Sequence, residues 1–408
     1  MAAAGSAGRL QAVNPFKSFF MGGFECSSHR HDGGPRLDVV AATKHDEMAA
    51  SDYRQLRNHG IQTVRDGLRW HLIDKGPLGY DWSSFLPMLR AANETGTQVI
   101  WDLCHYGWPD DLDIWSPAFV ERFGRFAEAT ARLIRDESDA VPFFCPVNEI
   151  SFWAWGGGDV GYLNPHLHGH GDRLKRLLVQ ASIAAIRAVR SVDPRARIVH
   201  AEPVIHIEPR GGHTQDIEPV AHHMTSQWHA LDMLAGRRLP ELGGRPEYLD
   251  IVGVNYYPNN QWVNDGGPIP LGRHDYRPFR DILLTAFRRY GRPMIVAETG
   301  AEGSAGPSWL HYIAGEVDAV IAAGVPVEGI CLYPVLDYPG WDDDRTCPVG
   351  LLQLAPGRHG RLVQEALATE LRRQIEIRIG ETRKRSRRPL VGDKRRPRRS
   401  TTPQSAQA

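Results

Sequence analysis

Short apolar runs alternate with longer segments of helical period over most of the chain. Runs of this length predict buried strands, and the segments between them predict amphipathic helices. The strand candidates span 19–25, 61–66, 97–104, 142–148, 197–202, 250–255, 293–298 and 328–334. The helix candidates span 46–59, 83–95, 116–136, 172–191, 216–235, 277–290, 308–323 and 361–374. Eight consecutive strand–helix pairs predict an α/β fold, the (β/α)8 TIM barrel.

An open, doubly wound sheet is the alternative arrangement of alternating strands and helices. That fold would place a glycine-rich phosphate turn after the first strand. The residues there, Met-Gly-Gly-Phe-Glu-Cys at 21–26, lack the required glycine spacing. We therefore expect a barrel over residues 16–379, preceded by a flexible N-terminus at 1–15.

Two of the predicted strands end on a glutamate. Glu149 closes Val-Pro-Phe-Phe-Cys-Pro-Val-Asn-Glu, and Glu298 closes Pro-Met-Ile-Val-Ala-Glu. A carboxylate at the end of a buried strand costs desolvation free energy and packs poorly, so such residues usually serve chemistry. The carboxyl ends of barrel strands converge on the face that carries the active site. Two carboxylates on that face are what hydrolysis of a glycosidic bond requires.

Charged and aromatic residues follow two further predicted strands. Arg65 ends the second apolar run, and its guanidinium needs a carboxylate partner because it does not lose its proton. Glu298 is one candidate, which the pairing would keep ionised, and Asp66 or a loop residue is equally compatible with the local sequence. His105 and Trp108 follow the third strand and could supply a donor and a sugar-stacking ring. A lone histidine at such a position is more often structural.

The remaining strand ends add amides and aromatic rings. Asn148 lies beside Glu149 and could hydrogen-bond a sugar hydroxyl next to the scissile bond. Asn255 and Tyr257 follow the sixth strand, and Trp341 follows the eighth. A single aromatic residue is more often part of the core than of a binding wall. The recurrence of aromatic and polar residues at successive strand ends predicts a carbohydrate or glycoside substrate, since sugars offer C–H faces to rings and hydroxyls to polar groups.

The formal net charge of zero hides an uneven distribution. Residues 381–400 carry ten Lys or Arg and two acidic residues, a charge of +8, so the rest of the chain carries −8. The composition from 380 to 408 predicts a disordered basic tail. Arg-rich tails can bind nucleic acid or another anionic surface. A solvated tail without a specific partner is the more common case, and the tail has no aromatic residues for base stacking, so we expect no such partner.

Neither a metal nor an organic cofactor is expected. The five cysteines are scattered without metal-ligand spacing and predict buried free thiols. His166, His168 and His170 alternate in a Gly-rich loop, which favours a surface loop over the active-site face rather than a metal site. The chain starts without a charged segment followed by an apolar stretch, and no run is long enough for a membrane span. A cytoplasmic location is therefore expected.

Together these motifs resemble clan A glycoside hydrolases, most closely family 1, the β-glucosidase-like retaining enzymes. The resemblance runs from about residue 19 to residue 352. The family's Asn-Glu-Pro acid/base motif is similar to Asn148-Glu149-Ile150, and its Thr-Glu-Asn-Gly nucleophile motif is similar to 297–300. Its strand 2 Arg, its strand 3 His and its Gly-Ile-Asn-Tyr-Tyr signature are matched by Arg65 with Trp70, His105 ahead of Trp108-Pro109, and Gly253-Val254-Asn255-Tyr256-Tyr257.

The chain departs from the family where the sugar would be held. The family's strand 8 reads Leu-Leu-Asp-Asn-Phe-Glu-Trp, whereas residues 335–341 read Val-Leu-Asp-Tyr-Pro-Gly-Trp. Gly340 therefore replaces the glutamate that binds distal hydroxyls, and the family's strand 1 glutamine has no clear match at 25–28. The resemblance implies a retained catalytic pair with a sugar other than plain glucose.

The resemblance implies a retaining β-glycosidase that cleaves O-glycosidic bonds by double displacement. Glu298 would attack the anomeric carbon, held as a carboxylate by Arg65 and Tyr257. Glu149 would protonate the leaving oxygen and then activate water. Two alternatives stay open: a barrel that binds carbohydrate without cutting it, and a transglycosidase that uses the same residues with another acceptor.

Overall fold

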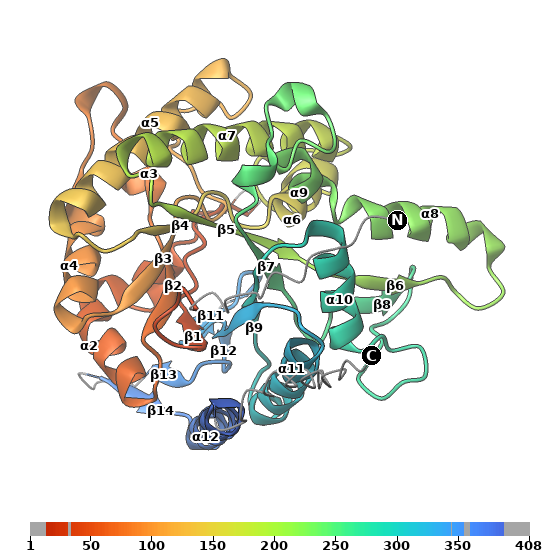
Figure 1. Cartoon of the computed structure of the whole chain (residues 1–408). Coiled ribbons are helices and arrows are strands. Elements are labelled where there is room, and N and C mark those ends of the chain that lie inside the picture. The colour runs from red at the N-terminus through yellow and green to blue at the C-terminus, as the bar shows by residue number, and fades with distance from the viewer. Residues whose placement is uncertain (1–13, 32–33, 344, 355–359, 387–408) are drawn as a thin grey trace, which may run out of the picture.

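The computed structural model describes residues 14–31, 34–343, 345–354 and 360–386, the last six of these as backbone only. Eight parallel strands close into a barrel in the order β1-β10-β9-β7-β5-β4-β3-β2 (Figure 1). The barrel strands are β1 (Phe20–Gly23), β2 (Thr63–Gly67), β3 (Gln98–Asp102), β4 (Phe143–Cys145), β5 (Arg197–Pro203), β7 (Ile251–Asn255), β9 (Met294–Thr299) and β10 (Val327–Leu332). The predicted (β/α)8 fold and its eight strands are confirmed.

Helices surround this barrel, as Figure 1 shows. The long ones are α2 (His45–Asn58), α4 (Leu86–Thr95), α5 (Pro117–Glu137), α7 (Gly171–Val192), α8 (Ile217–Ser226), α10 (Phe279–Tyr290), α11 (Ala305–Ala322) and α12 (Glu365–Ser386). The shorter ones are α1 (Val39–Ala42), α3 (Trp70–Ile73), α6 (Ile150–Trp153), the π-helix Ala154–Asp159, and α9 (His229–Leu234). Three small sheets complete the structure: β6 (His206–Glu208) with β8 (Gln261–Val263), β11 (Tyr338–Pro339) with β12 (Thr346–Cys347), and β13 (Leu352–Leu354) with β14 (Arg361–Val363).

The core has two layers because successive strand residues point to opposite faces. On β9, Ile295 and Ala297 lie inside the barrel, whereas Met294 and Val296 pack outward against the helices. The inner layer is completed by Phe16, Met21, Ile100, Phe143, Cys145, Val199, Ala201, Ile251, Cys331 and Tyr333. The five cysteines are free and buried, as predicted.

Two of the predicted helices differ from those observed. The helix expected at 216–235 is two helices, α8 and α9, separated at Gln227 and Trp228. The Gln227 side chain accepts a hydrogen bond from the Ile205 amide and donates one to the Met224 carbonyl. The helix expected at 361–374 begins only at Glu365, since residues 361–363 pair with β13 as a strand. That helix, α12, continues to Ser386, beyond the expected start of the tail at residue 380.

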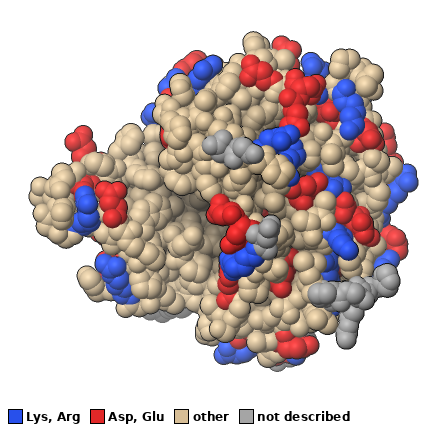
Figure 2. All heavy atoms as spheres, turned by 180° about the vertical axis from the view of Figure 1, so that it is seen from behind, with Lys and Arg blue, Asp and Glu red and all other residues tan. Residues whose placement is uncertain are grey.

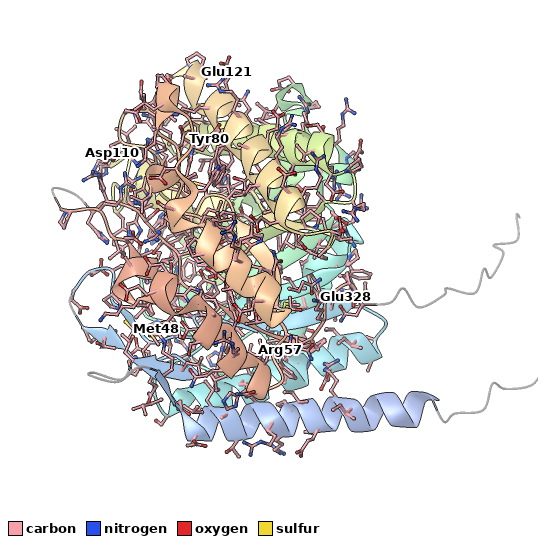
Figure 3. The ribbon with its side chains drawn as sticks, turned by 90° about the vertical axis from the view of Figure 1, so that its left-hand side faces the viewer. Met48, Arg57, Tyr80, Asp110, Glu121 and Glu328 are labelled. Atoms are coloured by element: carbon pink, nitrogen blue, oxygen red, sulfur yellow. The ribbon has the colours of Figure 1, made fainter. Side chains whose placement is uncertain are left out.

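The helix α12 lies along one edge of the molecule and extends past the rest of the fold (Figure 3). The remainder of the predicted tail, 387–408, and residues 1–13 of the flexible N-terminus predicted at 1–15 lie outside the described residues. Within the described part of the chain, no helix has the length and apolar character needed to cross a membrane.

A buried ion network ties the C-terminal segment to the barrel. Arg361 makes two hydrogen bonds with Asp52, of 2.9 and 2.8 Å. His45 lies between Asp52 and Asp66, 2.8 Å from an oxygen of each, and the Tyr53 hydroxyl donates to Asp66 at 2.6 Å. Burial lowers the pKa of His45, but Asp66 and Asp52 outweigh burial and raise this pKa to about 9. The histidine is therefore a cation at neutral pH.

Replacing Asp52→Asn should lower the free energy of unfolding by about 3–5 kcal/mol, because Arg361 and His45 would keep buried charges without their shared partner. Urea unfolding followed by tryptophan fluorescence measures the change. The control is Glu94→Gln, which removes an exposed ion pair with Arg54 and should cost less than about 1 kcal/mol. An Asp52→Asn protein within 1 kcal/mol of wild type would contradict this account.

Candidate active site

Glu298 reaches the barrel interior through an irregularity in β9. Strand alternation puts Ile295 and Ala297 inside, so a regular strand would turn Glu298 outward. The pairing with β7 shifts at this point: Val254 pairs with Val296, but the next residue, Asn255, pairs with Glu298. A bulge of this kind re-aims a side chain. Glu298 is 5% exposed.

Arg65, on β2, is bonded to Glu298, which is one of the two alternatives predicted for its carboxylate partner. Its Nη1 donates to Glu298 Oε1 at 2.6 Å. Its Nε and Nη2 donate to Asp102 at 2.9 and 2.6 Å, and Nη2 also donates to Asn148 Oδ1. The guanidinium is buried, so these carboxylates balance a charge that water cannot solvate. The Tyr257 hydroxyl donates to the other oxygen of Glu298 at 2.9 Å, as the sequence analysis proposed.

Glu149 stands at the start of α6, in a different chemical setting. It is the N-cap residue with a left-handed backbone, φ 43°, and its amide donates to Ala201 of β5 at 2.9 Å. The Asn255 amide donates to Glu149 Oε1 at 2.8 Å, and the Tyr106 hydroxyl donates to Oε2. Unlike Glu298, Glu149 makes no hydrogen bond to a cationic side chain of the described residues.

Burial raises the pKa of both glutamates. For Glu298, the Arg65 charge lowers the pKa and the Glu149 charge raises it. For Glu149, hydrogen bonds from Tyr106 and Asn255 lower the pKa, and the charge of Glu202 raises it. When two close carboxyl groups share one proton, the group without a cation partner holds the proton. The cation contact therefore favours the charged form of Glu298 over that of Glu149.

Asn148 and His105 connect the two halves of the site. The Asn148 amide nitrogen lies 3.0 Å from His105 Nε2 and donates at 3.0 Å to the Tyr106 hydroxyl. His105 Nδ1 lies 3.1 Å from Asp102 Oδ2. A network in which each member has its partners holds the side chains in one arrangement. These contacts make His105 a structural group of the site, where it supports Asn148.

The two predicted tryptophans lie in different surroundings. Trp341 packs against His29, with ring centroids 4.6 Å apart, and against Tyr106 at 5.7 Å, so it borders the site at Glu149. Trp108 packs on Trp153 at 5.8 Å and donates from Nε1 to the Leu112 carbonyl. Its face lines a hollow with Arg30, Arg36, Asp110, Ile114, Trp115 and Asn164. A sugar-stacking role for Trp108 stays a prediction.

Three important residues were missed by the sequence analysis. Asp102 is the main partner of Arg65, and Tyr106, with φ 66°, donates to Glu149. Glu202 is the penultimate residue of β5, is 3% exposed, and accepts a hydrogen bond from the Ser151 amide at 3.1 Å. Burial raises the pKa of Glu202 to about 7. Glu202 ends an apolar run as Glu149 does, so the same criterion could have found it.

One group of described side chains has the spacing of metal ligands: Cys26, Asp102 and His105. Asp102 is already bonded twice by Arg65, so a cation there would have to displace a buried guanidinium. Burial raises the pKa of the Cys26 thiol well above its usual range, which disfavours the thiolate that binds metals. In the histidine-rich loop, His166 Nδ1 lies 3.2 Å from the Gly161 carbonyl oxygen.

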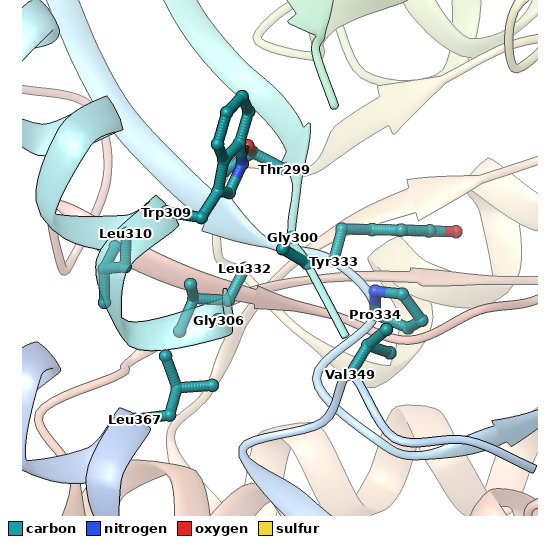
Figure 4. Close-up of a pocket in the computed structure, with 11 residues that line it drawn as sticks. Thr299, Gly300, Gly306, Trp309, Leu310, Leu332, Tyr333, Pro334, Val349 and Leu367 are labelled. Carbon is teal, nitrogen blue, oxygen red and sulfur yellow. Dashed lines mark hydrogen bonds between the residues drawn. The ribbon is translucent and has the colours of Figure 1, made fainter. Parts of the chain in front are cut away.

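The surroundings of the site include a cavity and a surface hollow. A small cavity lies outside the barrel wall next to β9 and β10, lined mainly by apolar residues such as Trp309, Leu310 and Leu367 (Figure 4). On the back of the molecule, the surface is hollowed beside the projecting part that contains α8, β6 and β8 (Figure 2). This part follows β5 and β7, so it stands at the same barrel end as Glu202 and Asn255.

Comparison with known proteins finds similar folds among solved structures. No family model and no curated protein matches the sequence. Among solved structures, the AHE enzyme from Alicyclobacillus herbarius has a TM-score of 0.72 at 17% identity, covering 90% of this chain and 98% of that one. The family 1 β-glucosidase from Thermotoga maritima has a TM-score of 0.71 at 16% identity, with the same coverage. The β-glycosidase from Thermosphaera aggregans has 0.66 at 16%, covering 88% and 95%. The predicted resemblance to family 1 is thus confirmed at the level of the fold.

Proposed function

We propose that this protein is a retaining β-glycosidase acting on O-glycosides. One observation carries the proposal: Glu298 is bonded to Arg65 and Tyr257, whereas Glu149 is bonded to the neutral groups of Tyr106 and Asn255. Two carboxyl groups in such unequal settings can act as nucleophile and acid. The fold likeness to proteins named β-glucosidases supports the same function.

In the first step, Glu298 attacks the anomeric carbon and forms a C–O bond to it. The bond from that carbon to the leaving oxygen breaks, and the proton of Glu149 goes to that oxygen. Arg65 and Tyr257 keep Glu298 ionised and oriented for the attack. In the second step, Glu149 takes a proton from water, and the resulting oxygen nucleophile releases the sugar from Glu298.

The substrate is proposed to differ from a plain glucoside. Gly340 has no side chain to bind the distal hydroxyls of a sugar, at the position where the resemblance would require a glutamate. Carbohydrate binding without cleavage and transfer to an acceptor other than water use the same residues. Product analysis with a competing alcohol separates transfer from hydrolysis.

Incubation with a panel of 2-deoxy-2-fluoro glycosyl fluorides should add the mass of one sugar to the intact protein. The fluorine slows breakdown of the covalent intermediate more than its formation. Mass spectrometry should find the adduct in wild type and in the control Glu302→Gln, which alters an exposed ion pair with Arg345, but not in Glu298→Gln. An adduct that persists in Glu298→Gln would reject this residue as nucleophile. If no sugar labels the protein, glycan-array binding tests the non-catalytic alternative.

Replacing Glu149→Gln should lower kcat/KM for alkyl β-glycosides about 10²- to 10⁴-fold, because the leaving alkoxide needs a proton. The loss should be much smaller for 2,4-dinitrophenyl glycosides, whose leaving group departs without one. Steady-state kinetics on both substrates measure the difference. Equal losses on both would contradict the assignment of Glu149 as the acid.

Removing the charge of Glu202 should lower the pKa of Glu149, since that charge raises it. Activity that needs protonated Glu149 falls above this pKa, so Glu202→Gln should move the basic limb of the kcat/KM profile to lower pH. The amide oxygen of the new glutamine can still accept from Ser151. The control is Glu328→Gln, which removes a carboxyl group at the start of β10, the opposite end of the barrel. A basic limb that does not move would refute the coupling.

A further inference from the structure

Glu25 brings a further carboxylate to the site from the end of β1. It is 8% exposed, and its Oε1 accepts a hydrogen bond from the Ser27 amide at 2.9 Å. His105 Nε2 lies 3.6 Å from the same oxygen, beyond hydrogen-bond distance. Among the described residues, the second carboxylate oxygen has no hydrogen-bond partner. The charge of Glu25 also raises the pKa of Glu298.

Tyr333 adds a buried hydroxyl without a partner. The residue is 2% exposed, and its oxygen makes no hydrogen bond in the described part of the chain. Its ring lies parallel to His105, with centroids 6.3 Å apart, and 5.3 Å from the Arg65 guanidinium. Figure 4 shows the hydroxyl pointing away from the cavity lined by Trp309. Burial and the charge of Glu25 raise the Tyr333 pKa, so the phenol stays protonated.

Two more polar atoms at this end of the barrel lack partners. His29 Nδ1 and Trp341 Nε1 are buried and without hydrogen bonds to any described group. Their rings are 4.6 Å apart and belong to the loops after β1 and β10. An unpaired buried polar group costs about 1–3 kcal/mol. Several together at the site of proposed catalysis indicate a polar ligand that satisfies them.

The balance of charge indicates what kind of ligand fits. Arg65 is fully engaged by Asp102 and Glu298, and burial lowers the pKa of His29 to about 3, so His29 is neutral. Even with His105 protonated and Glu149 neutral, three carboxylates face two cations. Of these three carboxylates, Asp102, Glu298 and Glu25, only Glu25 has no counterion at hydrogen-bond distance, since His105 Nε2 lies 3.6 Å from its Oε1. A cationic substituent on the ligand would supply the missing charge.

We propose that Glu25, with the Tyr333 hydroxyl, binds a protonated amine on the sugar, so that the preferred substrate is an amino-sugar glycoside. This inference rests on the proposed glycosidase function. The ammonium group donates to the free oxygen of Glu25 and to the Tyr333 oxygen. An ammonium hydrogen bond to a carboxylate is stronger than one from a neutral hydroxyl. Glu25 thereby binds the charged substituent of a cationic sugar, whereas Gly340 has no side chain to bind the hydroxyls of a neutral sugar.

The test compares 4-nitrophenyl β-glucoside with its analogues that carry an amine at C3, C4 or C6. At a pH where the amine is protonated, wild type should cleave at least one analogue with a kcat/KM about tenfold above the parent. Glu25→Gln should lower the ratio of amino to parent substrate at least about tenfold. The control Glu94→Gln, an exposed residue, should keep the wild-type ratio. A parent glucoside that is cleaved as well as every analogue overturns the proposal.

A binding measurement separates this inference from the proposed function. Calorimetry with Glu298→Gln measures binding of the same four glycosides without turnover. Preference for an amino analogue, lost in the double variant with Glu25→Gln, supports the amine site even if wild type cleaves nothing, in which case the glycosidase proposal alone fails. Cleavage without amine preference rejects the amine site and keeps the glycosidase. Equal binding of all four overturns the amine site.

Discussion

The buried guanidinium of Arg65 is the interaction on which the rest of the site depends. This one arginine, on β2, bonds three residues from β3, from the segment after β4 and from β9: Asp102, Asn148 and Glu298. A buried cation is tolerated only where its donors are satisfied by acceptors of opposite charge. The pairs therefore lock the relative positions of β2, β3, β9 and the segment after β4. Loss of any partner would leave an uncompensated charge at the centre of the barrel.

The same cation separates the two glutamates chemically. Both are buried, so burial alone would favour protonation of each. Of the two, Arg65 bonds only Glu298, whereas Glu149 is bonded to Tyr106 and Asn255 and its pKa is raised further by the charge of Glu202. Identical side chains thereby stand in different electrostatic surroundings set by their partners. Two unlike carboxyl groups on one barrel face are the physical basis of the proposed chemistry.

The site also holds polar atoms that the folded protein leaves unsatisfied. The Tyr333 hydroxyl, the Trp341 indole nitrogen and Asn255 Oδ1 are buried without partners among the described residues. Elsewhere the structure pairs its buried charges closely, as in the network of His45 and Asp52. Buried polar groups without partners persist where function outweighs their cost in stability. These three atoms lie at the barrel end that carries Glu149 and Glu298, where the proposed substrate would supply partners for them.

The sequence by itself determined the barrel, because the alternation of apolar strands and amphipathic helices is a local pattern that admits few folds. It also singled out Glu149, Asn255 and Glu298 as candidates for one barrel end, since each follows or closes an apolar run. Only the tertiary structure decided between Glu298 and Asp66 as the partner of Arg65 and revealed Asp102, Tyr106 and Glu202. Those choices depend on which strands are neighbours, on the bulge in β9 and on a left-handed backbone at Tyr106 and Glu149. Contacts between strand ends far apart in the chain leave no periodic trace in the sequence, so they become visible only when the barrel closes.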